Sequence, residues 1–241
     1  MNAANVAANE ANRLLAMLPA EDWQAIKKFL TVVTPPTGTI LQEIGEPMDH
    51  VYFPHSGMVS LLTVMKDGRA IETATIGSEG AVGAEMALGV TNAITRGVVQ
   101  IEMTASRISR KDFMRCVERR AAIRNLAFRS NEALIGQTQQ TAACNALHQI
   151  EARLARWLLQ SQDRSPAKGM VPLTQEFLSE MLAVRRTSVS TTAHVLQSAG
   201  LIKYSRGAIT IVNREGLKKK SCECYASIAK HTERLLSKPL A

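Results

Sequence analysis

Residues 173–212 read LTQEFLSEMLAVRRTSVSTTAHVLQSAGLIKYSRGAITIV. Two segments of this stretch carry apolar side chains at helical spacing, which is the pattern of two short amphipathic helices. We expect Thr174 to cap the first helix. Ala183-Val184 forms the turn, and Gly200 ends the second helix because glycine adopts the left-handed conformation at little cost. Two β-rich runs follow, so the sequence predicts a helix-turn-helix with a wing. The wing strands are expected at 201–204 and 208–212, with Ser205, Arg206 and Gly207 at the tip.

The second of these helices is expected to have one buried and one polar face. The buried stripe is Val189, Ala193 and Leu196. A DNA major groove admits one α-helix, and residues near the start of such a helix contact base edges. An arginine there can donate two hydrogen bonds to guanine. The alternative interpretation is a solvated helix face without a ligand. The candidate DNA contacts are Arg185, Arg186, Thr187, Ser190, Thr191, His194 and Arg206.

Positive charge is concentrated in the same part of the chain. Residues 161–241 contain 13 Lys and Arg against 6 Asp and Glu, whereas residues 1–110 contain 8 against 11. Basic charge confined to one module indicates a polyanionic partner such as double-stranded DNA. Lys218, Lys219 and Lys220 extend this patch, although a single lysine run more often serves solubility.

The first half of the chain has a different character. Short β-rich runs alternate with glycines over residues 32–108, which predicts a small barrel or roll. Pro19 divides the helical segment before it into two helices. After it we expect a short helix over 109–117 and one long helix over 120–161. The predicted fold class is α+β, with a jelly-roll-like (double-stranded β-helix) domain over residues 1–118, a long dimerisation helix over 119–162 and a winged helix-turn-helix over 163–241.

The predicted long helix carries two unusual features. Leu147, Ile150, Leu154 and Trp157 repeat with steps of 3, 4 and 3, as in a coiled-coil seam. We therefore expect a homodimer interface there, with Leu134 also contributing; the alternative is a seam buried against the chain's own domains. Residues 136–141, GQTQQT, place polar groups on every face of the helix. Such a belt suggests contact with water, a partner or a ligand.

Several function classes are disfavoured by the sequence. It contains no phosphate-binding glycine-lysine loop, no His-Glu-x-x-His motif and no nucleophile elbow, so we expect no enzyme. No apolar run approaches the length of a membrane span, and the N-terminus does not resemble a signal peptide, so we expect a cytoplasmic protein without a membrane partner. Cys222 and Cys224 supply only two ligands, whereas a structural zinc site needs four, so no metal site is expected.

The order of these parts resembles the Crp–Fnr family of transcription regulators. The resemblance covers about residues 15–215 and rests on the sequence EIGE at 43–46, the VYF run at 51–53 leading to Gly57, ISRKDF at 108–113, and residues 173–202. It implies a homodimer that reads a palindromic operator, with half-sites roughly 34 Å apart. It also implies an effector-binding roll and RNA polymerase as a further partner. The alternative function is a ligand sensor whose basic module binds a protein.

The resemblance is weaker at the effector site. Family members that bind cyclic AMP use a glutamate for the ribose and an arginine for the phosphate. Alignment on Gly83 puts Ala84 and Ala93 at these positions, while a shifted alignment brings in Glu85 and Arg96. We expect that cyclic AMP is not the ligand, because a buried phosphate without its cation is costly. The candidate pocket residues are Gly83, Ala84, Glu85, Arg96, Thr138 and Gln139, the last two matching helix positions that touch the nucleotide in the family.

Other sensing chemistries of the family also fit poorly. The oxygen sensors hold an iron–sulfur cluster with N-terminal cysteines, and this chain has none before Cys116. Haem needs an axial ligand, and His50 and His55 are lone histidines. We therefore expect neither haem nor an iron–sulfur cluster. In the recognition helix, Arg186-Thr187 followed by Thr191 replaces the family's usual Arg-Glu and later Arg, which indicates a different DNA consensus.

Overall fold

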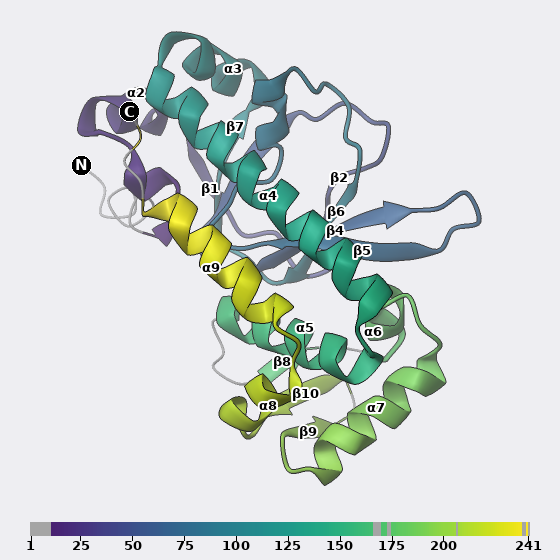
Figure 1. The fold of residues 1–241 in the computed structure, drawn as a ribbon. Helices are drawn as coiled ribbons and strands as arrows, with labels where there is room; N and C mark the ends of the chain where they lie inside the picture. Colours follow the sequence, from purple (N-terminus) through teal and green to yellow (C-terminus); the bar gives the residue numbers. More distant parts are fainter. Residues whose placement is uncertain (1–10, 166–169, 173–174, 206, 238–239, 241) are drawn as a thin grey trace.

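The N-terminal half is a roll of two antiparallel sheets, which the chain forms between residues 31 and 109 (Figure 1). One sheet has the strand order β1-β7-β3 and the other β2-β6-β4-β5. Side chains from both sheets, including Val59 and Ala105, meet in one buried cluster. The α+β fold class with an N-terminal roll is therefore confirmed. The structure, a computed structural model, describes residues 11–165, 170–172, 175–205, 207–237 and 240.

Tight turns connect the strands of the roll. Gly57 has a φ of +81°, and a Cβ atom there would lie 2.7 Å from the carbonyl oxygen of Ile101. This position therefore requires glycine for both conformation and space. The strands are β1 Thr31–Val33, β2 Ile40–Gln42, β3 His50–Pro54, β4 Met58–Val64, β5 Ala70–Ile76, β6 Arg96–Ile101 and β7 Ala105–Ser109, with the short helix η2 Ala84–Leu88 between β5 and β6.

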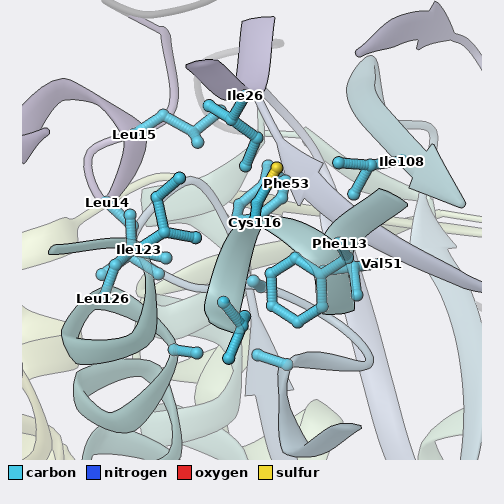
Figure 2. Packing of buried hydrophobic residues seen from close by; sticks show 14 of the residues in the cluster. Leu14, Leu15, Ile26, Val51, Phe53, Ile108, Phe113, Cys116, Ile123 and Leu126 are labelled. Carbon is cyan, nitrogen blue, oxygen red and sulfur yellow. The ribbon is translucent and has the colours of Figure 1, made fainter. Parts of the chain in front are cut away.

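Helices cover one end of the roll. The helices η1 Leu15–Met17 and α2 Ala20–Lys27 are separated at Pro19, as predicted. Ser109 caps α3 Arg110–Arg119 by accepting a hydrogen bond from the backbone of Asp112. These helices, strand β3 and the first turns of α4 (Ala121–Leu147) bury a common core, because each presents an apolar face to the others (Figure 2). Its central side chains are Leu14, Leu15, Ile26, Val51, Phe53, Ile108, Phe113, Cys116, Ile123 and Leu126.

The predicted single helix over 120–161 is wrong. The chain instead forms α4 Ala121–Leu147 and α5 Ile150–Arg164, and His148 and Gln149 between them have extended backbone with ψ near 144° and 153°. The break turns α5 away from α4. The apolar side chains of α5 therefore pack in a second core together with the helices and strands that follow α5 in the chain. The energy of burying those side chains favours the break over a continuous helix.

The C-terminal module contains the predicted helix-turn-helix and wing. Strand β8 pairs with β10, so the wing is part of a three-stranded sheet that the sequence did not reveal. Thr174 and Arg206 lie outside the described residues. The elements are β8 Met170–Pro172, α6 Gln175–Met181, α7 Arg186–Ser198, β9 Ile202–Ser205, β10 Ala208–Ile211 and α8 Arg214–Lys220.

The last helix, α9 Cys224–Leu236, leaves this module and lies along α4 (Figure 1). Gly136 makes the approach possible, because a Cβ atom on it would lie 2.6 Å from Nε2 of His231. At the far end, Arg13 forms an ion pair of 2.7 Å with Glu233. The chain therefore returns to its N-terminal half, which the sequence analysis did not anticipate.

A polar joint connects the roll to α5. The indole Nε1 of Trp157 donates to Glu72 at 2.9 Å, and the Ser60 hydroxyl donates to the same carboxylate at 2.6 Å. Burial raises the pKa of Glu72. Met58 and Leu62 of β4 belong to the same core as the helix-turn-helix, so the C-terminal module packs directly on the roll. Within the described part of the chain, no helix is both long and apolar enough to cross a bilayer.

Candidate nucleic-acid interface

The two helices of the helix-turn-helix meet at an unusual turn. Ala183 has a φ of +50°, and it is the one non-glycine residue with positive φ among the described residues. The turn is closed by the backbone N–H of Val184, which donates to Ser179 O at 3.0 Å. A left-handed alanine costs about 1–2 kcal/mol, so packing of the helices on either side holds it in place.

Helix α7 has the two faces that the sequence predicts. Val189, Ala193 and Leu196 are buried in the second core, which confirms the predicted stripe. Gly200 ends the helix with a φ of +69°, and the N–H of Leu201 donates to Leu196 O at 3.0 Å. The opposite face is open to solvent. It carries Arg186, Thr187, Thr191 and His194, which are exposed, and Ser190, which is half-buried.

The hydroxyl groups on that face are oriented by the helix itself. Ser190 Oγ donates to Arg186 O, and Thr191 Oγ1 donates to Thr187 O, both at 3.0 Å. Each hydroxyl has a single proton, so its oxygen is left to act as an acceptor. Arg186 is therefore the strong hydrogen-bond donor of the first turn, and the serine and threonine are better suited to accept from amino groups.

The start of α7 is electropositive. Arg185 is the N-cap residue and makes no side-chain cap hydrogen bond, in contrast to a capping serine. The N-terminal end of a helix attracts anions, and Arg185 and Arg186 add two exposed charges. Lys203 is exposed on β9 and was missed by the sequence analysis. The alternation of buried and exposed side chains along β9 could have identified Lys203, because neighbouring Ile202 faces the core.

A groove runs beside this helix start. It has a volume of about 970 Å³ and separates the β4–β5 hairpin from the turn between α6 and α7. Met65 and Arg69 line it from the hairpin, and Ala183, Arg185 and Arg186 line it from the turn and α7. The roll therefore borders the candidate DNA-reading surface directly.

The one cation among the candidate effector residues, Arg96, is paired with a carboxylate of the chain itself. The Nε of Arg96 donates to both oxygens of Glu43, at 2.8 and 3.1 Å. Glu85 is half-buried, and burial raises the pKa of its carboxyl group. Gly83 is held at a φ of +83° before η2, and Ala84 is buried. On α4, the Thr138 hydroxyl donates to Leu134 O at 2.8 Å, while Gln139 is exposed.

Two glutamines of the polar belt of α4 have partners on other elements of the chain, whereas the buried hydroxyl of Thr141 has none among the described residues. Gln137 is bonded to Thr75 of β5, and Gln140 donates to the sulfur of Cys224 at 3.1 Å. His55 is one of the two lone histidines of the roll. It has a partner within the roll, because its Nε2 lies 2.9 Å from the Ser106 hydroxyl.

The predicted dimer seam requires correction. Leu154 and Trp157 are buried in the chain's own second core, so they are inaccessible to a partner. Ile150 is also packed against that core, and Leu134 packs against the roll. Only Leu147 of the five is largely exposed, at 80%. Ile150, Leu154 and Trp157 therefore form the inward face of α5, packed against the chain's own domains, which was the alternative interpretation.

The fold also assembles a group of potential metal ligands. Donor atoms of Cys144, His148, Cys222 and Cys224 all lie within 4.8 Å of one another. The expectation of no metal site counted Cys222 and Cys224 alone. The other two ligands come from the end of α4, so sequence spacing could not reveal the set.

Comparison with known proteins identifies both halves of the chain. The cyclic nucleotide-binding domain family matches residues 32–120, and the Crp-like helix-turn-helix domain family matches residues 152–220. A cyclic nucleotide-binding-like domain joined to a helix-turn-helix domain defines the class as a transcription regulator. The chain belongs to the Crp/Fnr family. No curated protein matches it by sequence.

Solved structures agree with this assignment at the level of the fold. FixK2 from Bradyrhizobium japonicum is 16% identical, with a TM-score of 0.68 over 80% of this chain and 98% of that one. A Crp/Fnr-family regulator from Eubacterium rectale is 16% identical, with a TM-score of 0.69 over 87% and 98%. The c-di-GMP responsive global regulator CLP of Xanthomonas campestris is 17% identical, with a TM-score of 0.64 over 80% and 99%.

Proposed function

We propose that this protein is a homodimeric, cytoplasmic transcription regulator that reads a palindromic operator with α7 in the major groove. The observation that carries the proposal is the division of α7 into a buried apolar face and an exposed face led by Arg186. The basic excess of residues 161–241 supports a polyanionic partner. By family resemblance, RNA polymerase is the expected protein partner once the regulator is on DNA.

The side chains of α7 have distinct expected roles. Arg186 donates two hydrogen bonds to the O6 and N7 of a guanine. The oxygens of Ser190 and Thr191 accept from the amino groups of adenine or cytosine, since their protons are used within the helix. Arg185 and Lys203 contact phosphates, which adds affinity but no sequence preference.

The dimer interface lies on α4 rather than on α5. Phe128 and Ile135 are 42% and 56% exposed, which is unusual for large apolar side chains on a helix surface. They are seven residues apart, and exposed Ala142 follows at the same interval. The seam of a two-stranded coiled coil repeats every seven residues, so this exposed apolar row supplies one of its two heptad positions. A second copy of α4 covers this stripe.

The oligomeric state distinguishes the two possible seams. Ile135→Glu places a charge in the α4 stripe and is expected to give monomers in multi-angle light scattering. Leu147→Glu is the matched control, because Leu147 is more exposed but lies off the repeat. A dimer that survives Ile135→Glu, or dissociates with Leu147→Glu instead, would contradict the α4 interface.

The effector, if bound in the roll, is not cyclic AMP. Arg96 is engaged by Glu43, so a cyclic phosphate would have to break that ion pair to gain its cation. Ala84 and Ala93 are both buried, and their side chains have no polar atom that could contact a nucleotide. We expect the affinity for DNA to be unchanged by cyclic AMP.

Selection of bound duplexes from a random pool tests the proposed function. The expected result is enrichment of a palindrome with a guanine in each half-site and half-sites roughly 34 Å apart. Recovery of no preferred sequence, with and without small-molecule extract, would refute sequence-specific reading. Binding that depends on salt but not on sequence would reduce the role of α7 to phosphate contacts.

A further inference from the structure

Three cysteines and a histidine converge where the two halves of the chain meet. Cys144 lies in the last turn of α4, and His148 follows it at the break before α5. They are one helical turn apart, so both reach the same side. Cys222 lies in the connection between α8 and α9, and Cys224 is the first residue of α9. The cluster thus connects the break in the long helix to the start of the C-terminal helix.

We propose that Cys144, His148, Cys222 and Cys224 form a tetrahedral site for a thiophilic divalent metal ion, Zn²⁺. The Sγ atoms of Cys144 and Cys222 are 3.5 Å apart, and the Sγ of Cys224 is 3.5 Å from Nδ1 of His148. Zinc lies about 2.3 Å from sulfur and about 2.0 Å from nitrogen, so the ligand atoms of a tetrahedral site are roughly 3.5–3.8 Å apart. Two of the spacings match this geometry, and all four donor atoms lie within 4.8 Å of one another. Three cysteines with one histidine are a known structural ligand set.

Neighbouring groups orient these ligands as they do in zinc sites. Nε2 of His148 lies 3.3 Å from a carboxylate oxygen of Glu223, while Nδ1 faces the sulfurs. A histidine ligand usually gives its second N–H to a carboxylate, which fixes the ring and its tautomer. The amide of Gln140 donates to Cys224 Sγ at 3.1 Å, which stabilises a thiolate.

The charge around the cluster also suits a metal. Three thiolates and one zinc ion carry a net charge of −1, which needs a cation when buried. Two arginines of α5, Arg153 and Arg156, lie close enough to the cluster for their charges to act on its cysteines. Among the described residues, no acceptor bonds to the buried Nε of Arg153 or of Arg156.

Arg153 extends the cluster toward the DNA-binding surface. Its Nη2 donates to the carbonyl oxygen of Leu182 at 2.6 Å, next to the left-handed Ala183 that starts the turn before α7. A metal ion would therefore hold the break between α4 and α5 and support the base of the helix-turn-helix. Partial exposure of His148 leaves a route for the ion to enter.

A disulfide is the competing use of the same residues. The sulfurs of Cys144 and Cys222 are close enough to react after a small movement, but a disulfide uses only two donors. It gives no role to His148 or to its carboxylate partner, Glu223. All four donors converge within one small volume, which favours metal coordination.

Metal analysis of the purified full-length protein tests the site. We expect one zinc ion per chain by mass spectrometry of the metal, after reconstitution with ZnCl₂ under reducing conditions and dialysis. Cys144→Ser, Cys222→Ser and Cys224→Ser should each lose the ion. Cys116→Ala is the matched control, because Cys116 is buried in the core of the roll away from the cluster. A zinc content of the wild type no higher than that of these serine variants, or a native Cys144–Cys222 disulfide, would overturn the proposal.

Two measurements separate ligand loss from misfolding. Cobalt loaded in place of zinc should show the visible absorption of a tetrahedral thiolate site, and His148→Ala should change that spectrum. Glu223→Gln keeps every ligand and alters an exposed side chain. It should weaken zinc binding by about 10–100-fold in competition with a chelator, as loss of a histidine's partner does elsewhere. An octahedral cobalt spectrum, or equal zinc affinity in Glu223→Gln, would contradict the assigned coordination.

Discussion

The role of Arg186 yields a quantitative prediction about DNA recognition. In the second turn of α7, the protons of Ser190 and Thr191 are used by the helix backbone, so Arg186 in the first turn supplies the strong donors. A bidentate arginine–guanine contact is worth about 1–3 kcal/mol of discrimination. Arg186→Ala should therefore weaken binding to the selected operator by roughly 5–150-fold per half-site, since 1.4 kcal/mol corresponds to about tenfold.

Fluorescence anisotropy with the selected operator, a variant at one base pair and a random duplex measures this effect. Arg186→Ala should lose most of its affinity on the operator and bind operator and base-pair variant alike. Arg185→Ala is the matched control, because this neighbouring arginine is expected to contact phosphate. It should weaken binding to all three duplexes and reduce the salt slope by about one. If Arg186→Ala lowered affinity equally on all duplexes, base reading by this residue would be refuted.

Three further predictions concern stability and packing. Ala183→Gly should raise the free energy of unfolding in urea by about 0.5–1 kcal/mol by relieving left-handed strain, whereas Ala199→Gly, at a right-handed position, should lower it by a similar amount; a loss in both would argue against strain. Burial raises the pKa of Glu72 in the folded protein above its unfolded value of about 4.3. The protonated side chain therefore contributes its full stability below the unfolded pKa, and this stability is lost as the pH rises through the folded-state pKa. Glu72→Gln should therefore gain stability relative to the wild type between pH 4 and 8, and parallel stability profiles would contradict this. Leu154→Glu should unfold the C-terminal module because it buries a charge, and near-ultraviolet circular dichroism measures this loss of packing. A variant that is folded but monomeric would instead indicate that α5 forms the dimer seam.

Much of the candidate DNA interface could be predicted from the sequence because its signals are local. The period of Val189, Ala193 and Leu196 determines which side of α7 is buried, and hence which side Arg186 occupies. Gly200 marks the end of that helix for a conformational reason that involves no distant residue. The glycine-separated strands of the roll were predictable on the same basis.

The same local reasoning failed where two tertiary arrangements share one period. The spacing of Leu154 and Trp157 fits a coiled-coil seam, but spacing alone does not identify the surface that packs against these side chains. Burial of these side chains against the helix-turn-helix and roll breaks the helix at His148. The ion pair of Arg96 with Glu43 likewise joins residues whose proximity depends on the pairing of β2 with β6.

Sequence alone determined the order of the parts: the roll, the helical region and the basic winged module. Helical periods, turn glycines and local charge act over a few residues, so they can be read along the chain. Only the tertiary structure decided the break between α4 and α5, the return of α9 and the meeting of Cys144 with Cys222 from 78 residues away. These features depend on contacts between distant segments, whose energies become available only when the whole chain has packed.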